Sequence, residues 1–216
     1  DAPLALLEKC VSALRLSPRQ VQPAPGSLYL SGLWSALGRL PDRIRTAPGL
    51  TMAPLQPFLM NSLVKQESIF EELQNRDLLL HHPYESFEGY VNFIRAAARD
   101  PLVTSIQQTV YRMDALSPVI DALKSAAGAK KRVRVVIELR ARFDEMNNLR
   151  LAEELRKAGV EVIFGFGRLK VHAKVALVAR RENGKEQLYT HLSTGNYNAA
   201  TARAYEDLAI LSSRPE

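Results

Sequence analysis

The pattern of hydrophobic and polar positions changes near residue 65. Before that point, eight of the twelve prolines interrupt any long periodic run, because proline lacks a backbone donor and breaks helices. Only two short amphipathic helices are predicted there, over residues 4–16 and 28–37. We therefore expect residues 1–64 to form a short Pro-rich helical segment with a linker, and residues 65–216 to form the main domain.

Beyond residue 65, apolar runs of strand length alternate with amphipathic stretches of helix length. The pattern predicts helices over residues 85–99, 117–127, 144–158 and 199–204, and strands over 77–81, 102–112, 132–139, 160–165, 171–180, 186–192 and 207–211. The Asn183-Gly184 pair between two of these strands is a strong signal for an antiparallel hairpin. Strands alternating with helices predict a layered α/β domain, and the hairpin makes its sheet mixed.

Composition and charge narrow the class of protein. A chain of 216 residues with 46% hydrophobic and 24% charged residues is typical of a globular protein. It has no apolar run near the roughly 18 residues that a membrane span needs. The single cysteine, Cys10, excludes an intramolecular disulfide and a cysteine-based metal site. The net charge of +6 favours anionic partners such as phosphates. We expect a cytoplasmic protein, with a position at an anionic membrane surface as the alternative, and a start at Asp1 suggests a fragment.

The stretch around His172 carries the most informative chemistry. If residues 171–180 form a strand, His172 and Lys174 point to the same face, because side chains two residues apart do so. An imidazole beside a fixed ammonium suits phosphoryl transfer: a ring nitrogen attacks phosphorus, and the ammonium offsets the charge of the phosphate oxygens. A Gly-Asn loop downstream adds Asn196 and Asn198 as candidate phosphate-binding residues. A structural histidine and an ordinary turn are the competing interpretations.

Two arginines follow predicted strands. Arg112 and Arg142 come after strand ends, where ligands gather in layered α/β domains, and guanidinium groups suit bidentate binding of phosphate oxygens. The alternative is a pair of ordinary surface arginines. Carboxylates at Glu138, Asp144 and Glu145 have the chemistry of metal ligands, but acids near a helix start more often act as caps and dipole partners.

Five motifs, in this order, closely resemble polyphosphate kinase. They are Leu80–Phe87 (LHHPYESF), Gln108–Arg112 (QTVYR), Glu138–Glu145 (ELRARFDE), Leu169–Lys174 (LKVHAK) and Thr194–Asn198 (TGNYN). The resemblance implies a phospholipase D-like α/β fold for residues 65–216, as the first of two such catalytic domains. It also implies that residues 1–64 end a preceding helical domain. Members of this family are much longer than this chain and carry another essential histidine in the second catalytic domain.

The resemblance also implies an activity and roles for single residues. The family reversibly moves the terminal phosphate of ATP onto polyphosphate, with Mg²⁺, through a phosphohistidine. By motif, His172 is the expected phosphohistidine and Lys174 its phosphate-binding neighbour. Arg112 and Arg142 match the Mg²⁺-phosphate region, and because a guanidinium only donates, we expect them to bind the phosphates that carry the metal. Tyr205 matches a tyrosine that contacts the nucleotide.

The expected partners are ATP or ADP and inorganic polyphosphate, in a full-length parent that is a homo-oligomer. A chain with one half-site is expected to be inactive, or nearly so, alone. Two other functions stay open: a phospholipase D-like phosphodiesterase or nuclease completed by dimerisation, and a non-enzymatic module that binds polyphosphate or RNA. Aromatic residues make up only 7% and form no clustered stacking platform, so nucleic acid is disfavoured as a partner.

Overall fold

The computed structural model describes residues 3–21, 32–49, 52–53, 55–65, 69–111, 113, 117–139, 145–165, 167 and 169–214. The chain divides into two compact units, Asp1–Pro54 and Leu55–Glu216. The division falls before the predicted boundary at residue 65, so helix α4 (Asn61–Val64) belongs to the second unit.

The first unit contains short helices. These are α1 (Leu4–Ala13), a 3₁₀ turn η1 (Pro18–Gln20), α2 (Gly32–Gly38) and α3 (Asp42–Arg45). Helix α1 ends earlier than predicted because Arg15 takes a positive φ of 52°, a left-handed conformation that a helix cannot continue through. No residue of α1 is buried. Residues 28–31 of the second predicted helix lie outside the described residues.

The second unit alternates strands and helices. The helices after α4 are α5 (Ile69–Asn75), α6 (Glu88–Arg99), α7 (Pro118–Gly128), α8 (Glu145–Lys157) and α9 (Ala199–Ala204). The strands are β1 (Leu78–His82), β2 (Val103–Val110), β3 (Arg132–Ile137), β4 (Glu161–Phe164), β5 (Lys174–Glu182), β6 (Lys185–Ser193) and β7 (Asp207–Ser212). Helix α5 was not predicted; its apolar residues Ile69, Phe70 and Leu73 are buried in the core.

The strands form one mixed sheet in the order β1-β7-β6-β5-β2-β3-β4. Strands β2, β3 and β4 are parallel, and the remaining neighbours pair antiparallel. The predicted α/β class, with a mixed sheet flanked by helices, is confirmed. The predicted hairpin is also present between β5 and β6, where Asn183 and Gly184 take positive φ values of 48° and 79°.

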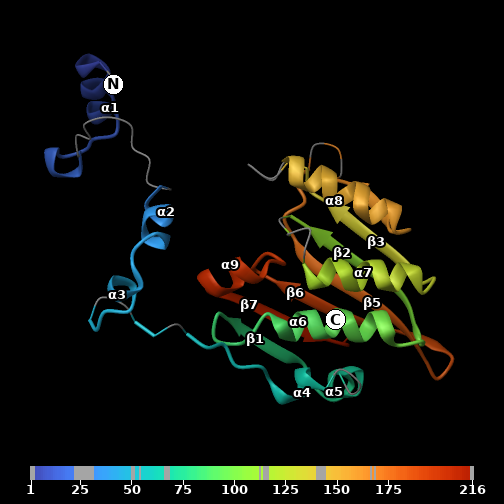
Figure 1. Ribbon diagram of the computed structural model, residues 1–216. Coiled ribbons are helices and arrows are strands. Elements are labelled where there is room, and N and C mark those ends of the chain that lie inside the picture. Colours follow the sequence, from blue (N-terminus) through green and yellow to red (C-terminus); the bar gives the residue numbers. More distant parts are fainter. Residues whose placement is uncertain are drawn as a thin grey trace. The chain divides into compact units, whose positions relative to one another are not determined.

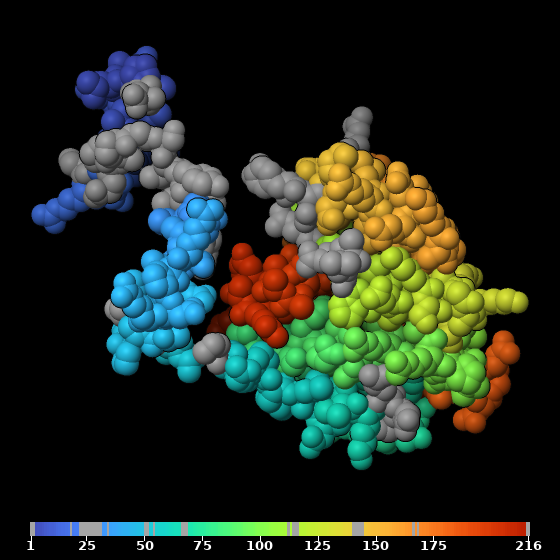
Figure 2. Space-filling model, in the orientation of Figure 1, coloured from blue at the N-terminus to red at the C-terminus, as the bar shows by residue number. Residues whose placement is uncertain are grey.

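Helices α6 and α7 lie side by side across one face of the sheet (Figure 1). In the space-filling view their green and yellow-green atoms cover the strands behind them (Figure 2). Inward-facing strand residues such as Leu80, Ile106 and Val178 are buried at 1% exposure or less beneath this layer. Ser117 caps the start of α7 as predicted, because its Oγ accepts a hydrogen bond from the N–H of Val119. Pro118 is the first residue of the helix.

Strand β5 begins three residues later than predicted, and this places His172 outside the strand. The pairing of β5 with β6 starts at Lys174 with Ser193, and residues 170–173 belong to no strand. The backbone on both sides of His172 binds side chains instead of a neighbouring strand. The two side chains do meet, as expected. The expected cause, alternation of side chains along one strand, is wrong, because His172 lies outside β5.

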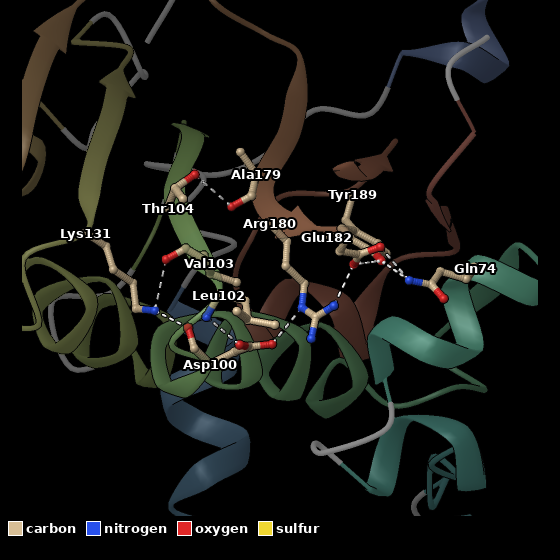
Figure 3. Close-up of polar contacts among 10 residues, drawn as sticks. All are labelled: Gln74, Asp100, Leu102, Val103, Thr104, Lys131, Ala179, Arg180, Glu182 and Tyr189. Atoms are coloured by element: carbon tan, nitrogen blue, oxygen red, sulfur yellow. Dashed lines mark hydrogen bonds and ion pairs between the residues drawn. The ribbon is translucent and has the colours of Figure 1, made fainter. Parts of the chain in front are cut away.

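A polar network stabilises the end of the sheet where β2 starts and β5 ends (Figure 3). Arg180 Nε donates to Asp100 Oδ2 at 2.8 Å and Arg180 Nη1 donates to Glu182 Oε1 at 2.6 Å. Gln74 and Tyr189 also donate to the Glu182 carboxylate, at 2.6 Å and 2.5 Å. These contacts join α5, the start of β2, β5 and β6 at the end of the sheet away from His172.

Among the helices of the described ranges, none is long and apolar enough to cross a membrane.

Candidate active site at the His172 end of the sheet

The antiparallel and parallel pairings bring several chain segments to one end of the sheet. Strands β2 and β3 finish there at Val110 and Ile137, whereas β5 starts there opposite the last residue of β6. Strand β7 also starts there, at Asp207. We call this region the His172 end of the sheet. It is where the carboxyl ends of the parallel strands lie, which is the usual place for a ligand site in such a sheet.

His172 and Lys174 meet at this end. The Lys174 Nζ lies 3.2 Å from both His172 ring nitrogens, Nδ1 and Nε2. The in-plane directions of the two nitrogens diverge, so an ammonium equidistant from both lies against the ring and not along either axis. The in-plane lone pair that would attack phosphorus is therefore not the direction that Lys174 occupies. The His172 side chain is exposed, whereas Lys174 is buried at 7% exposure.

Charge at this position favours the neutral imidazole. The Lys174 ammonium, partial burial and the Lys170 ammonium together lower the pKa of His172 below its ordinary value of 6.5. Burial also lowers the pKa of Lys174, against the opposing effect of the Asp207 carboxylate. A neutral ring with a nearby cation has the properties of a nucleophile that attacks an anionic group.

Tyr111 and Lys170 belong to this cluster, and sequence reasoning did not assign either a role. The Tyr111 ring lies edge-on to His172, with centroids 5.0 Å apart and an interplanar angle of 77°. The ammonium groups of Lys170 and Lys174 lie 5.3 Å and 5.5 Å from the Tyr111 centroid. An aromatic ring attracts cations to its face, so Tyr111 helps to hold both lysines beside His172. Tyr111 lies in the motif QTVYR and Lys170 in the motif LKVHAK, and this was the only sign in the sequence that they belong to the site.

The Gly-Asn loop lies next to the same cluster. Thr194 Oγ1 donates to Asp207 Oδ1 at 2.7 Å, which joins this loop to the start of β7. The Asn196 Oδ1 is buried without a hydrogen-bond partner, so this side chain has an unsatisfied acceptor. The Asn198 Oδ1 accepts from the N–H groups of Ala200 and Thr201 and caps α9.

Tyr197 anchors this loop from the inside. Its ring stacks on Tyr90 at 4.4 Å, and its hydroxyl lies 3.1 Å from the His191 Nδ1. Burial and the nearby His82 lower the pKa of His191 to about 3, so this ring is neutral. His191 is 1% exposed, as expected for a structural histidine. The loop that holds Asn196 is therefore fixed to the core by a packed aromatic cluster.

The remaining candidate residues fall in different places. Tyr205 follows α9 and is 64% exposed. Arg112 and Arg142 lie outside the described residues. A cavity of about 390 Å³ lies between the starts of α6, α7 and α9, and its lining includes Phe87, Asn198 and Arg203 but neither His172 nor Lys174.

The described residues offer no cage for a metal. Across the described ranges, no group of three or more His, Cys, Asp or Glu side chains is placed to hold an ion. Mg²⁺ prefers oxygen ligands and usually keeps waters or binds through substrate phosphates. The Glu138 and Asp207 carboxylates at this end already accept hydrogen bonds, from Val171 and Thr194. The residues described at this end would therefore hold a magnesium ion only together with bound phosphates.

Comparisons with known proteins find similar sequences and a similar structure. The family model described as "Polyphosphate kinase C-terminal domain 1" matches residues 68–216. A polyphosphate kinase of Bacillus cereus is 44% identical over 213 residues, which cover 99% of this chain and 30% of that protein. A polyphosphate kinase of Pseudomonas aeruginosa is 44% identical over 196 residues, covering 91% and 28% of the two chains.

A solved structure is similar over nearly the whole chain. The crystal structure of a polyphosphate kinase from Porphyromonas gingivalis superposes with a TM-score of 0.71 and 36% identity, covering 91% of this chain and 32% of that chain. This chain thus spans about 30% of the length of the Bacillus cereus relative that it matches.

Proposed function

We propose a function for this chain on the basis that it belongs to the polyphosphate kinase family. We propose that it supplies the nucleophile-bearing half-site of an enzyme that reversibly transfers the terminal phosphate of ATP to polyphosphate. The observation that carries this proposal is the placement of the Lys174 ammonium 3.2 Å from both nitrogens of an exposed, neutral His172. ATP, ADP and polyphosphate are the proposed substrates.

The proposed transfer has two steps. In the first, a neutral His172 ring nitrogen forms a bond to the γ-phosphorus of ATP, while the bond from that phosphorus to the β–γ bridging oxygen breaks and ADP leaves. In the second, a terminal oxygen of polyphosphate attacks the same phosphorus, the nitrogen–phosphorus bond breaks, and the neutral ring returns. The chain grows by one phosphate unit, and the reverse order of steps makes ATP.

Protein charge supports both steps. The Lys174 and Lys170 ammonium groups offset the charge on the transferred phosphoryl oxygens, and their fixed positions need no reorganisation during the reaction. We assign Arg112 and Arg142 to binding the phosphates, and Asn196 and Asn198 to the same task from the Gly-Asn loop. Mg²⁺ neutralises charge on the nucleotide phosphates when it is bound with them.

Tyr205 is the proposed nucleotide contact. Its exposure of 64%, just after α9, leaves the aromatic ring accessible for stacking on a base. A cytoplasmic location and a homo-oligomeric full-length protein complete the proposal. Because His172 is exposed, and the chain spans about 30% of the Bacillus cereus relative, we propose that the isolated chain lacks groups needed for full turnover.

The test is phosphate transfer from γ-labelled ATP with Mg²⁺, in this chain and in the full-length protein. We expect acid-labile, base-stable label on the full-length protein and none on its His172→Ala variant. His81→Ala is the matched control, because His81 is also exposed on the same unit and should keep the label. A full-length protein that takes up no label, or that labels equally after His172→Ala, would overturn the proposal.

Two further assays on the same proteins, of phosphodiester hydrolysis and of polyphosphate binding, separate the alternatives. Hydrolysis of a phosphodiester without ATP would indicate a phospholipase D-like enzyme. Salt-sensitive polyphosphate binding that survives His172→Ala, without any transfer, would indicate an anion-binding module. Full transfer activity in the isolated chain would contradict only the proposal that this chain is incomplete.

A further inference from the structure

The backbone on either side of His172 is held by two side chains. Because residues 170–173 lie in no strand, their backbone groups have no strand neighbour to bind. The N–H of Val171 donates to Glu138 Oε2 at 2.7 Å, just before His172. Thr109 Oγ1 donates to the Ala173 carbonyl at 2.7 Å, just after it. The candidate nucleophile is therefore fixed from both sides.

Glu138 is a rigid anchor for the first of these contacts. It lies directly after β3 and is 3% exposed, so its carboxylate has lost most of its water. Its own N–H donates to the Val110 carbonyl at 3.0 Å, and its carbonyl accepts from Asn148 Nδ2 at 2.9 Å. Hydrogen bonds to a carboxylate are stronger than neutral ones, especially away from water. The Val171 contact is thus a strong bond to an immobile group.

Thr109, the next-to-last residue of β2, supplies the second contact. Its hydroxyl donates to Ala173, and the same oxygen accepts from the N–H of Val175 at 3.0 Å. One threonine side chain therefore satisfies a carbonyl and an N–H at the point where β5 joins β2. Thr109 thereby fixes the path of the chain from His172 into β5.

We propose that Glu138 and Thr109 are positioning residues for His172. Neither acts on phosphate: each binds backbone next to the nucleophile and so fixes the direction of its ring. In-line attack on phosphorus needs this alignment, and a displacement of about 1 Å can lower a rate by about 100-fold. This inference rests on the proposed phosphotransfer function and assigns two residues to it that the motifs alone left without a task.

The test uses the full-length protein and measures the rate of label transfer from γ-labelled ATP. Glu138→Ala and Thr109→Val should each lower the maximal rate by about 10- to 100-fold with little change in the KM for ATP, because neither residue binds nucleotide. Glu138→Gln keeps an oxygen acceptor and Thr109→Ser keeps a hydroxyl. Both conservative variants should recover most of the rate.

Matched controls exist at the other end of the sheet. Thr104 lies on the same strand as Thr109, and its hydroxyl also contacts a β5 carbonyl, that of Ala179 at 3.3 Å (Figure 3). Glu182 is another largely buried carboxylate, bound by Arg180. Thr104→Val and Glu182→Ala should lower the melting temperature but keep the rate per folded molecule.

Several outcomes would overturn the positioning role. Rates after Glu138→Ala and Thr109→Val that match those of the controls would show only a structural effect. A Glu138→Gln variant as slow as Glu138→Ala would show that the carboxylate charge matters and not the bond to Val171. Should Glu138→Ala fail to fold, the nearly isosteric Thr109→Val decides. Persistence of label after His172→Ala would instead overturn the proposed function itself.

Discussion

The α-carbon of Gly195 lies directly against the carboxylate of Asp207. A β-carbon at position 195 would lie 2.5 Å from Asp207 Oδ2 and 2.6 Å from its Cγ, closer than real β-carbons approach such atoms. The carboxylate is held there by the Thr194 hydroxyl, and its charge acts on Lys174. Glycine at this position therefore lets the Gly-Asn loop and β7 come together beside Lys174.

The first prediction concerns Gly195→Ala. The new methyl group must displace the Asp207 carboxylate from Thr194, so we expect a loss of about 1–3 kcal/mol in the free energy of unfolding. Label transfer to His172 should also fall, because the charge that faces Lys174 moves. Urea denaturation and the labelling rate measure the two effects.

Gly128→Ala is the control for that substitution. Gly128 lies at the end of α7, and a β-carbon there meets no atom within 4 Å. Stability should stay the same or rise slightly in this variant, since alanine favours the helix. Equal stability of the Gly195→Ala and wild-type proteins would show that Asp207 moves away without cost.

Much of the fold could be predicted from the sequence because its signals are local. The Asn183-Gly184 pair specifies a hairpin through its positive φ values, and Ser117-Pro118 starts a helix through its cap. Helix α5 was missed, since its short apolar run is explained only by the core against which Ile69 and Leu73 pack. Such tertiary contacts are not visible in a short window of sequence.

The sequence indicated which residues lie together at the candidate site, but not how they are arranged. The spacing of His172 and Lys174 indicated that they lie together, and the structure brings them together although His172 lies before β5 and only Lys174 lies in it. Thr109, Glu138 and Tyr111 were not recognised as their partners. Their contacts depend on which strands end beside one another, and pairing between distant strands leaves no local signal in the sequence.

The second prediction concerns the pKa of His172. Lys174 is the largest cause that lowers this pKa below 6.5, followed by burial and then Lys170. Removing a cation makes protonation easier, so Lys170→Gln should raise the pKa and Lys174→Gln should raise it further. NMR titration of the ring protons in this chain measures both shifts without requiring activity.

The rate of phosphate transfer should depend on the same pKa, because only the neutral His172 ring acts as the nucleophile. The acid limb of the rate should lie below pH 6.5 in the wild-type protein and move to higher pH in Lys170→Gln. Lys185→Gln, at the start of β6 on the far hairpin, is the control and should leave the titration unchanged. A larger shift in Lys170→Gln than in Lys174→Gln would contradict the assigned order of causes.

The third prediction uses the buried His191. Its pKa is about 3 in the folded chain, whereas an unfolded histidine takes up its proton near 6.5. Between these values the unfolded state binds more protons, so stability is fully present above pH 6.5 and is lost as the pH falls. The slope should reach up to about 1.4 kcal/mol per pH unit.

The variant that tests this slope is His191→Phe, which keeps a ring beside Tyr90 and Tyr197 but cannot titrate. Its free energy of unfolding should depend less on pH between 4.5 and 6.5 than that of the wild type. His81→Phe, at an exposed position, should retain the wild-type slope. Identical slopes in His191→Phe and the wild type would contradict the buried neutral ring.

The last prediction concerns Arg180, which bridges Asp100 and Glu182 at the end of the sheet away from His172 (Figure 3). Its side chain is 20% exposed, and its guanidinium also lies 5.2 Å from the Phe70 ring centroid. Arg180→Met keeps the apolar stem but leaves two largely buried carboxylates without their cation, so we expect the free energy of unfolding to fall by about 2–4 kcal/mol.

Arg214→Met is the control for this substitution. Arg214 forms an ion pair with Asp77, but its side chain is 69% exposed, so its loss should lower the free energy of unfolding by less than about 1 kcal/mol. Urea denaturation measures the free energy of unfolding of both variants. Equal losses of stability would mean that burial adds nothing to the Arg180 ion pairs. Transfer activity per folded molecule should be the same in both variants.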